Sequence, residues 1–181
     1  KLANPTGPGP NVRGSSRRHM LQAVDASLQR LGTDWIDLLY LHRDDENTPM
    51  EEAVATMAQL IASGKVRYFG VSNFRAWRIA RMAELCRAMG LPPPIACQPP
   101  YNAMSRQIEL EVLPAAQAYG LGVIPWSPLH GGLLSGALRK QREGGSGRST
   151  KGRSADMLAQ HHDTIAAYED LCDGLGEDPA H

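Results

Sequence analysis

Residues 35–42 read WIDLLYLH, a short apolar run that ends at a histidine. An apolar run of this length is typical of a strand that is buried on both faces. In front of it, apolar residues recur at helical spacing, from the candidate N-cap Ser16 to Gly32, where a left-handed residue can end a helix. The stretch therefore predicts a helix followed by a buried strand whose last neighbour is His42.

The same order of helix and strand repeats along the chain. Thr48-Pro49-Met50-Glu51 has the pattern of a capping box with proline at the first helical position, and the helix that it opens is expected to end at Gly64. Further strands are predicted at 66–71, 95–98 and 123–126, and further helices at 75–89, at 106–120 with an interruption at Pro114, and at 164–175. Strand and helix alternate about every 30 residues, the length of a βαβ unit. This alternation predicts an α/β fold with a parallel sheet, either open or closed into a barrel.

The composition excludes several classes of protein. The 181 residues have 42% hydrophobic and 21% charged side chains, which is a globular and not a disordered balance. Lys and Arg number 19, and Asp and Glu also number 19, so we expect no general attraction to nucleic acid or to a membrane surface. No run approaches the roughly 18 apolar residues of a membrane span. Three cysteines without metal-type spacing favour a reducing compartment, and we expect a cytoplasmic location.

Three charged clusters lack the pattern of a metal site or of a nucleic-acid-binding site. Asp44-Asp45-Glu46 is typical of solvated acids in a loop, and His161-His162-Asp163 lacks the i, i+4 spacing of a helical zinc pair, so we expect no metal site. Residues 139–154 form a basic stretch rich in Gly and Ser, which predicts a flexible polar loop. Because it has no interleaved aromatic residues, we expect this loop to fold over a bound cofactor rather than to bind nucleic acid.

Polar residues follow the predicted strands at the point where each strand ends. They are His42, Ser72-Asn73, Gln98 with Tyr101 just beyond it, and Ser127. Each one alone has a structural explanation, since Ser-Asn before a helix, for example, is a common N-cap. The carboxyl ends of parallel strands meet at one edge of the sheet, where α/β proteins carry their active sites. Four such positions in succession predict a functional site at that edge.

These positions lie within motifs that resemble the aldo-keto reductase family. The motifs are LYLHR at 39–43, GVSNF at 70–74, QPPYN at 98–102 and IPWSPLHGGLLSG at 124–136, in the family's order and at its intervals. The segments PTGPGPNVRGSSRRH at 5–19 and HRDDENTPMEE at 42–52 are most similar to the branch with bacterial aldehyde reductases and potassium-channel beta subunits. The resemblance covers nearly the whole chain.

The resemblance implies a fold and an activity. The family fold is a (β/α)8 TIM barrel, and residues 1–181 would be a single partial barrel domain that holds only the central βα units. Members transfer hydride between NADPH and a carbonyl or alcohol, so the expected substrate is a small aldehyde or ketone. His42 matches the family's catalytic histidine, which polarises the substrate oxygen. Lys1 falls where the catalytic lysine ends the third strand.

The resemblance also implies which residues bind the cofactor NADP(H). Ser72, Asn73 and Gln98 match the residues that hydrogen-bond the nicotinamide carboxamide, and Tyr101 matches the aromatic residue that stacks on the nicotinamide ring. The loop expected to carry the pyrophosphate contributes Ser127, Pro128, Leu129, Gly131 and Gly132. Small residues there let backbone N–H groups approach phosphate oxygens.

Some features of the family match no residue of this chain. The resemblance implies that the catalytic tyrosine and aspartate lie on strands upstream of Lys1, and that the final helix–strand portion, which usually holds the adenosine 2′-phosphate, would follow His181. We therefore expect the chain alone to be inactive. Two alternatives stay open: a non-catalytic NADPH-binding partner subunit, and a degenerate, inactive fragment. The sequence leaves open the physiological substrate, the preference between NADP and NAD, and assembly into an oligomer.

Overall fold

The computed structural model describes residues 1–9, 11–145, 147 and 153–180. The chain separates into two compact units, each described here by itself. The first contains residues 1–99 and 107–124, and the second contains residues 100–106 and 125–181. The expectation of a single partial barrel domain stays a prediction.

A parallel sheet forms the centre of the first unit. Within the described residues it has four strands in the order β1-β2-β3-β4, which are β1 (Ile36–Leu41), β2 (Val66–Ser72), β3 (Ala96–Gln98) and β4 (Gly122–Val123). All three pairings are parallel, as the alternation of strand and helix predicts. The chain therefore carries the partial α/β barrel architecture that the sequence indicates.

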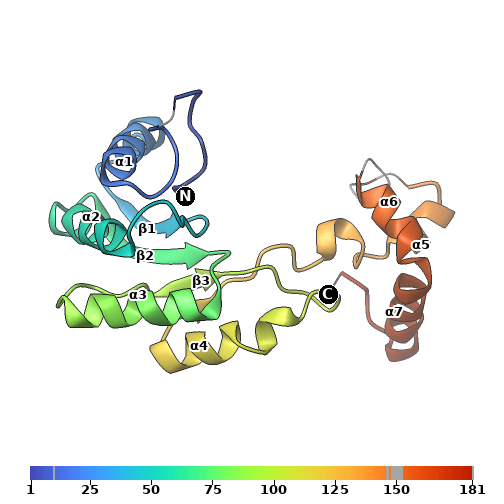
Figure 1. The fold of residues 1–181 in the computed structure, drawn as a ribbon. Helices are drawn as coiled ribbons and strands as arrows, with labels where there is room; N and C mark the ends of the chain where they lie inside the picture. Colours follow the sequence, from blue (N-terminus) through green and yellow to red (C-terminus); the bar gives the residue numbers. More distant parts are fainter. Residues whose placement is uncertain (10, 146, 148–152, 181) are drawn as a thin grey trace. The chain divides into compact units, whose positions relative to one another are not determined.

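Helices alternate with the strands along the chain and pack beside the sheet (Figure 1). They are α1 (Arg17–Leu31), α2 (Met50–Ala62), α3 (Ala76–Ala88) and α4 (Val112–Tyr119). Their buried faces meet the strands in one hydrophobic core, to which the sheet contributes Leu39, Leu41, Phe69, Val71 and Cys97. These strand residues are spaced two apart, so the residues between them lie on the opposite face of the sheet. That opposite face carries the residues considered below.

The ends of α1 agree with the sequence, whereas the start of α2 does not. Ser16 caps α1 by accepting a hydrogen bond from the backbone N–H of His19, and Gly32 ends the helix with φ of 66°. The capping box predicted at Thr48 is wrong, because α2 has no side-chain cap and the Thr48 hydroxyl donates to Asp45 Oδ2 at 2.7 Å. The Thr48 hydroxyl is therefore directed to Asp45 and accepts no hydrogen bond from the N–H groups at the start of α2.

The second unit is helical in its described residues. It contains α5 (Ala137–Arg142), α6 (Arg153–Gln160) and α7 (His162–Leu175). A small core joins them, formed by Leu133, Ala137, Leu138, Leu158 and Ile165. The buried Glu169 accepts hydrogen bonds from the backbone N–H groups of Leu138 and Arg139, which satisfies donors at the start of α5.

Three predicted elements differ from the structure. The fourth strand ends at Val123, because Pro125 has no N–H to continue the ladder. The helix predicted at 106–120 is a 3₁₀ turn (Gln107–Glu109) followed by α4, in which Pro114 lies in the first turn, where proline is tolerated. The loop predicted at 139–154 is helical at its start, in α5, and its residues 146 and 148–152 lie outside the described residues.

Candidate functional site

The strands align the first group of predicted site residues in one row. Ser72 and Gln98 are register partners, and His42 directly follows Leu41, the partner of Val71. Neighbouring residues on their strands point into the hydrophobic core, so these three side chains belong to the opposite face of the sheet. The predicted residues of β1, β2 and β3 therefore meet at the carboxyl ends of their strands.

The first residues of the chain extend the sheet beside β1. Leu2 forms a parallel bridge with Leu41; its N–H donates to the Tyr40 oxygen at 2.8 Å, and its own oxygen accepts from the His42 N–H at 3.1 Å. This pairing puts Lys1 next to Tyr40, and Lys1 Nζ lies 5.6 Å from the centre of the Tyr40 ring. Lys1 Nζ also donates to Gln98 Oε1. The structure thus brings Lys1 to the row of His42, Ser72 and Gln98.

Hydrogen bonds tie the ends of β1, β2 and β3 together. The hydroxyl of the buried Ser72 donates to the Gln98 backbone oxygen at 2.8 Å. The Asn73 side-chain amide donates to the His42 backbone oxygen at 2.9 Å and to Ser72 Oγ at 3.1 Å. Asn73 has φ of 58°, a left-handed conformation that Asn tolerates better than most residues. The row is therefore held by backbone and side-chain contacts together.

The surroundings of His42 favour its neutral form. Its pKa is lowered by burial first, and then by the positive charges of Lys1 and Arg43. The Asn4 side-chain nitrogen lies 2.8 Å from His42 Nδ1. A neutral imidazole can donate from one nitrogen while the other accepts, so His42 can bind the protein through one nitrogen and a carbonyl oxygen through the other.

Tyr40 is a buried polar residue that sequence reasoning does not single out. It lies one row below His42 on the same face, its side chain is 8% exposed, and its hydroxyl has no hydrogen-bond partner among the described residues. Burial raises the pKa of its phenol, with a smaller contribution from Cys97. The sequence shows Tyr40 only as part of an apolar strand, so its polar end carries no signal there.

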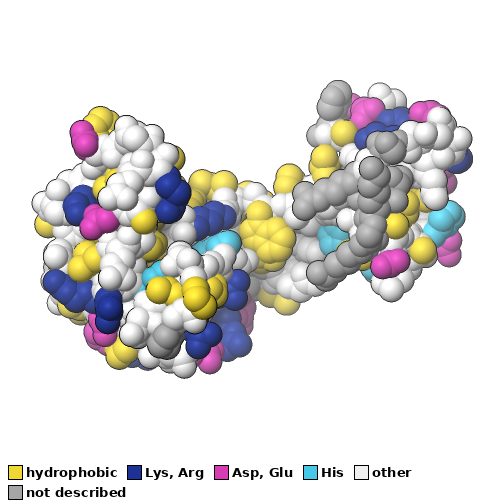
Figure 2. Space-filling view, turned by 90° about the horizontal axis from the view of Figure 1, so that it is seen from above, with side chains coloured by type: hydrophobic (Ala, Val, Ile, Leu, Met, Phe, Trp, Pro, Cys, Tyr) yellow, Lys and Arg dark blue, Asp and Glu magenta, His cyan; other side chains and the backbone are white. Residues whose placement is uncertain are grey.

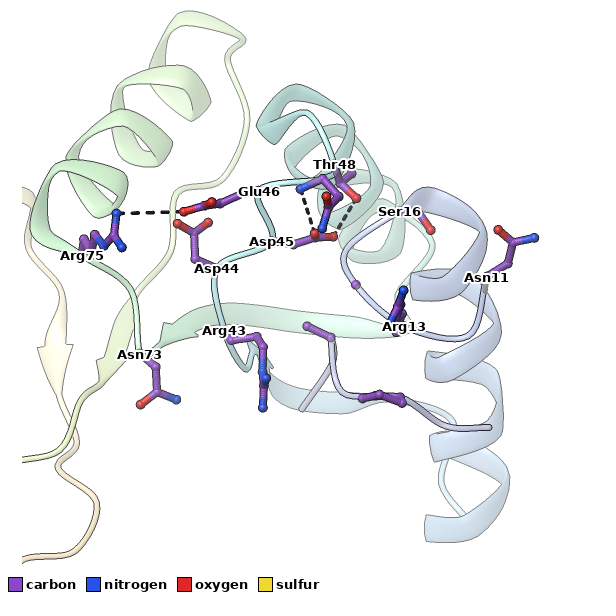
Figure 3. Close-up of a pocket in the computed structure, with 14 residues that line it drawn as sticks. Asn11, Arg13, Ser16, Arg43, Asp44, Asp45, Glu46, Thr48, Asn73 and Arg75 are labelled. Carbon is purple, nitrogen blue, oxygen red and sulfur yellow. Dashed lines mark hydrogen bonds and ion pairs between the residues drawn. The ribbon is translucent and has the colours of Figure 1, made fainter. Parts of the chain in front are cut away.

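A pocket of about 880 Å³ opens beside this row, at the loops that follow β1 and β2. Figure 3 shows Arg43 and Asn73 pointing to one side of it, away from Asp44 and Glu46. The acids are already engaged: Asp44 accepts from Arg78 at 2.9 Å, and Glu46 lies 4.0 Å from Arg75. The acidic run 44–46 thus consists of carboxylates bonded to neighbouring groups of the protein.

The remaining predicted site residues belong to the second unit. Tyr101 is half-buried, and its backbone N–H donates to the Trp126 oxygen at 3.3 Å. The loop after Trp126 turns through four residues with positive φ, Ser127 at 56°, His130 at 47°, Gly131 at 69° and Gly132 at 99°. Such turns orient backbone N–H groups toward one side, as in loops that bind anions. The described contacts give no acceptor to the N–H groups of Leu129 and Gly131.

Other kinds of site find no support among the described residues. No group of three or more His, Cys, Asp or Glu side chains there could hold a metal ion. Basic and acidic side chains are interspersed over the visible surface of each unit, without a single basic patch (Figure 2). No described helix is both long enough and apolar enough to cross a membrane.

Comparison with known proteins identifies the family. The chain matches the model of the Aldo/keto reductase family over residues 1–181. It is 40% identical over 176 residues to the uncharacterized oxidoreductase YrpG of Bacillus subtilis, covering 95% of this chain and 52% of that protein. It is 38% identical over 162 residues to the L-glyceraldehyde 3-phosphate reductase of Escherichia coli, covering 84% of this chain and 46% of that protein.

A third relative is named as a channel subunit and not as an oxidoreductase or reductase. The putative voltage-gated potassium channel subunit beta of Schizosaccharomyces pombe is 40% identical over 142 residues, covering 78% of this chain and 41% of that protein. The chain spans about half the length of the curated relatives it matches. The family match over the whole chain, together with the motifs at the strand ends, shows that this protein belongs to the aldo/keto reductase family.

Proposed function

We propose that this chain forms part of an NADPH-dependent oxidoreductase that reduces small aldehydes or ketones to alcohols. The observation that carries the proposal is the row of His42, Ser72 and Gln98, with Lys1 bonded to Gln98, on the sheet face opposite the core. NADPH, when bound, supplies the hydride. The strand ends thus offer three polar side chains and one cation. Such a set can bind the carbonyl group of a substrate and the carboxamide of the cofactor.

The residues of the first unit fit the nicotinamide end of this cofactor. A carboxamide needs both donors and acceptors, and Ser72, Asn73 and Gln98 offer a hydroxyl and two amides. These side chains are already oriented by hydrogen bonds within the protein, so little further ordering is needed when a ligand binds. We assign the carboxamide contacts to these three residues.

The loop of the second unit fits a phosphate group. The N–H groups of Leu129 and Gly131 have no acceptor among the described residues, and the loop has little side-chain bulk at Gly131 and Gly132. Backbone N–H groups in positive-φ turns are good ligands for phosphate oxygens. We assign the pyrophosphate to Ser127, Pro128, Leu129, Gly131 and Gly132, and the stacking contact with the nicotinamide to Tyr101.

His42 and Lys1 are the proposed catalytic residues. His42, held neutral, donates a hydrogen bond to the carbonyl oxygen, on which negative charge develops as the hydride arrives. In the family a tyrosine completes the reaction by giving a proton to that oxygen, and the lysine beside it lowers the tyrosine's pKa. No residue of this chain matches that tyrosine, so we expect the 181 residues by themselves to show no reductase activity.

The test is NADPH-dependent reduction of several small aldehydes and ketones by the natural gene product that contains this chain. His42→Ala should lower kcat at least about tenfold, the loss of one polar contact to a developing charge, and leave NADPH affinity unchanged. The control is His162→Ala, which removes an exposed histidine of α7 and should change neither quantity. Unchanged kcat in His42→Ala, or a loss confined to NADPH affinity, would refute the assignment.

A non-catalytic, nucleotide-binding partner subunit is the second candidate. The observation that favours it is the 40% identity to a protein named as a potassium channel subunit beta. Such a subunit would bind NADPH and assemble with other chains, yet it would not turn over any carbonyl substrate. Light scattering would measure assembly, and NADPH binding without turnover on any aldehyde would favour this candidate over the enzyme.

A further inference from the structure

The side chain of Asn4 contacts the ring of His42 on the side away from its Nε2 atom. Asn4 Nδ2 lies 2.8 Å from His42 Nδ1. Backbone contacts fix His42 and the residue before Asn4: the His42 N–H donates to the Leu2 oxygen at 3.1 Å, and the Ala3 oxygen accepts from the Gly14 N–H at 3.0 Å. Ala3 has φ of 84°, and this turn follows the Leu2 bridge and leads directly to Asn4.

The chemistry of the amide decides which nitrogen of His42 carries the hydrogen. An amide nitrogen is only a donor, so the facing Nδ1 must accept, and the hydrogen of the neutral ring then lies on Nε2. Asn4 Oδ1 is now buried without a hydrogen-bond partner among the described residues. If the amide were rotated by 180°, its NH₂ group would take that place and its two N–H donors would lack an acceptor. Buried N–H groups without an acceptor are rarer in proteins than underused oxygens.

We propose that Asn4 is a positioning residue that holds His42 in its Nε2–H tautomer, so that the ring presents an N–H donor to the substrate oxygen. The part of this inference that concerns substrate rests on the proposed function, whereas the tautomer is a property of the chain itself. In functional histidines, a hydrogen bond on one ring nitrogen commonly fixes the tautomer and the orientation of the ring, so that the other nitrogen can bind a ligand.

The charges around His42 act in the same direction. The charged side chains that lower its pKa are Lys1 and Arg43, both cationic, and Asp44, the first acid after His42 in the sequence, is bonded to Arg78. An imidazolium would carry hydrogens on both nitrogens and would set an N–H against the amide of Asn4. Both the cations and Asn4 therefore disfavour protonation of His42.

Asn4→Asp is the sharpest test because it keeps the size of the side chain and reverses its hydrogen-bonding role. A carboxylate only accepts, so it should draw a hydrogen onto Nδ1 and raise the pKa of His42 by about one pH unit or more. Thr6→Asp is the control: it adds the same charge to the same loop at an exposed residue whose described hydrogen bonds go to Val12. It should leave the tautomer unchanged.

The measurement is ¹⁵N NMR of histidine-labelled natural gene product, with the His42 signals identified by their loss in His42→Gln. Protein with Asn4 should show an unprotonated Nδ1 and a protonated Nε2 at neutral pH, and Asn4→Asp should exchange the two. Asn4→Ala should give a mixture of tautomers. A protonated Nδ1 with Asn4 in place, or the same tautomer in all variants, would overturn the proposal.

Kinetics separates this inference from the proposed function. With an active reductase, Asn4→Asp should lower kcat at least about tenfold and leave the KM for NADPH unchanged, since only the donor to the substrate oxygen is lost. The expected tautomers without turnover in any variant would support the role of Asn4 and count against the enzyme. Turnover without the expected tautomers would support the enzyme and count against the role of Asn4.

Discussion

Gly70 leaves the space that the ring of Tyr40 occupies. The two residues are register partners in β1 and β2, and a Cβ on Gly70 would lie 2.7 Å from Cε1 of Tyr40. It would also lie 2.7 Å from the backbone oxygen of Ala96 on the other side. Because the Ala96 oxygen belongs to the sheet and cannot turn away, the close approach of three strands requires glycine here.

Gly70→Ala should therefore destabilise the protein. Added volume in a well-packed region costs about 1–3 kcal/mol, and here the new methyl group meets backbone as well as a ring. Gly174→Ala is the control, because a Cβ on this α7 glycine meets nothing within 4 Å. Alanine in a helix should leave stability unchanged or raise it by about 0.5–1 kcal/mol. Denaturant unfolding compares the two, and equal midpoints would contradict the packing argument.

Asn73 combines a left-handed backbone with a side chain that bonds β1 to β2. Asn73→Gly keeps the conformation at φ of 58° but removes the amide that donates to the His42 oxygen. Asn73→Ala removes the amide and also strains the backbone, so it should be less stable than Asn73→Gly by about 1 kcal/mol. Thermal or denaturant unfolding measures the difference; if the alanine variant is as stable as the glycine variant, the strain is absent.

Tyr101 provides a test of the proposed nicotinamide contact. If its ring stacks on the nicotinamide, Tyr101→Ala should weaken NADPH binding about tenfold, because stacking is worth about 0.5–1.5 kcal/mol beyond area burial. Tyr101→Phe keeps the ring and should bind NADPH nearly as the natural residue does. Fluorescence titration gives both affinities, and an unchanged affinity in the alanine variant would count against stacking.

The strands could be predicted because each is a short apolar run followed by a polar residue. β1 and β2 begin and end within one or two residues of the prediction, since the later residues of both strands, 39–41 and 69–72, are buried. The cap of α2 could not be predicted, because Asp45 competes for the Thr48 hydroxyl and no local pattern shows that contact. The sequence does not predict α5, because its basic residues and the glycines near it are typical of a loop. No local pattern shows the contact with Glu169 that fixes the start of this helix.

Some residues of the candidate site can be predicted from the local sequence, whereas others are revealed only by contacts in the folded chain. His42, Ser72 and Gln98 could be found because each ends its strand, and parallel strands bring such residues to one edge. Asn4 and Tyr40 could not, since an asparagine in a Pro- and Gly-rich segment and a tyrosine in an apolar strand are ordinary there. Their significance comes from contacts between residues about 38 positions apart or from burial of a hydroxyl, which only the folded chain shows.

Asp45 joins two loops beside the candidate site. Its Oδ2 accepts from the Ser15 N–H at 2.7 Å and from the Thr48 hydroxyl at 2.7 Å, and its Oδ1 accepts from the Asn47 N–H at 3.1 Å. A Cβ on Gly14 would collide with Oδ2, so the loop before α1 closes tightly over the carboxylate. Burial tends to raise the pKa of Asp45, but these hydrogen bonds outweigh it and lower the pKa.

Asp45 should therefore make stability depend on pH in the acid range. Because its pKa is lower in the folded than in the unfolded chain, its contribution is fully present above the ordinary value of 3.8 and is lost as pH falls through the lowered pKa. Asp45→Asn should cost about 1.5–3 kcal/mol at neutral pH, the range for hydrogen bonds to a charged group, and should flatten the dependence below about pH 4. Glu46→Gln, which changes an exposed acid 4.0 Å from Arg75, should keep the natural profile. Urea unfolding from pH 2 to 7 measures all three proteins, and parallel profiles for Asp45→Asn and the natural chain would show that Asp45 is not the group responsible.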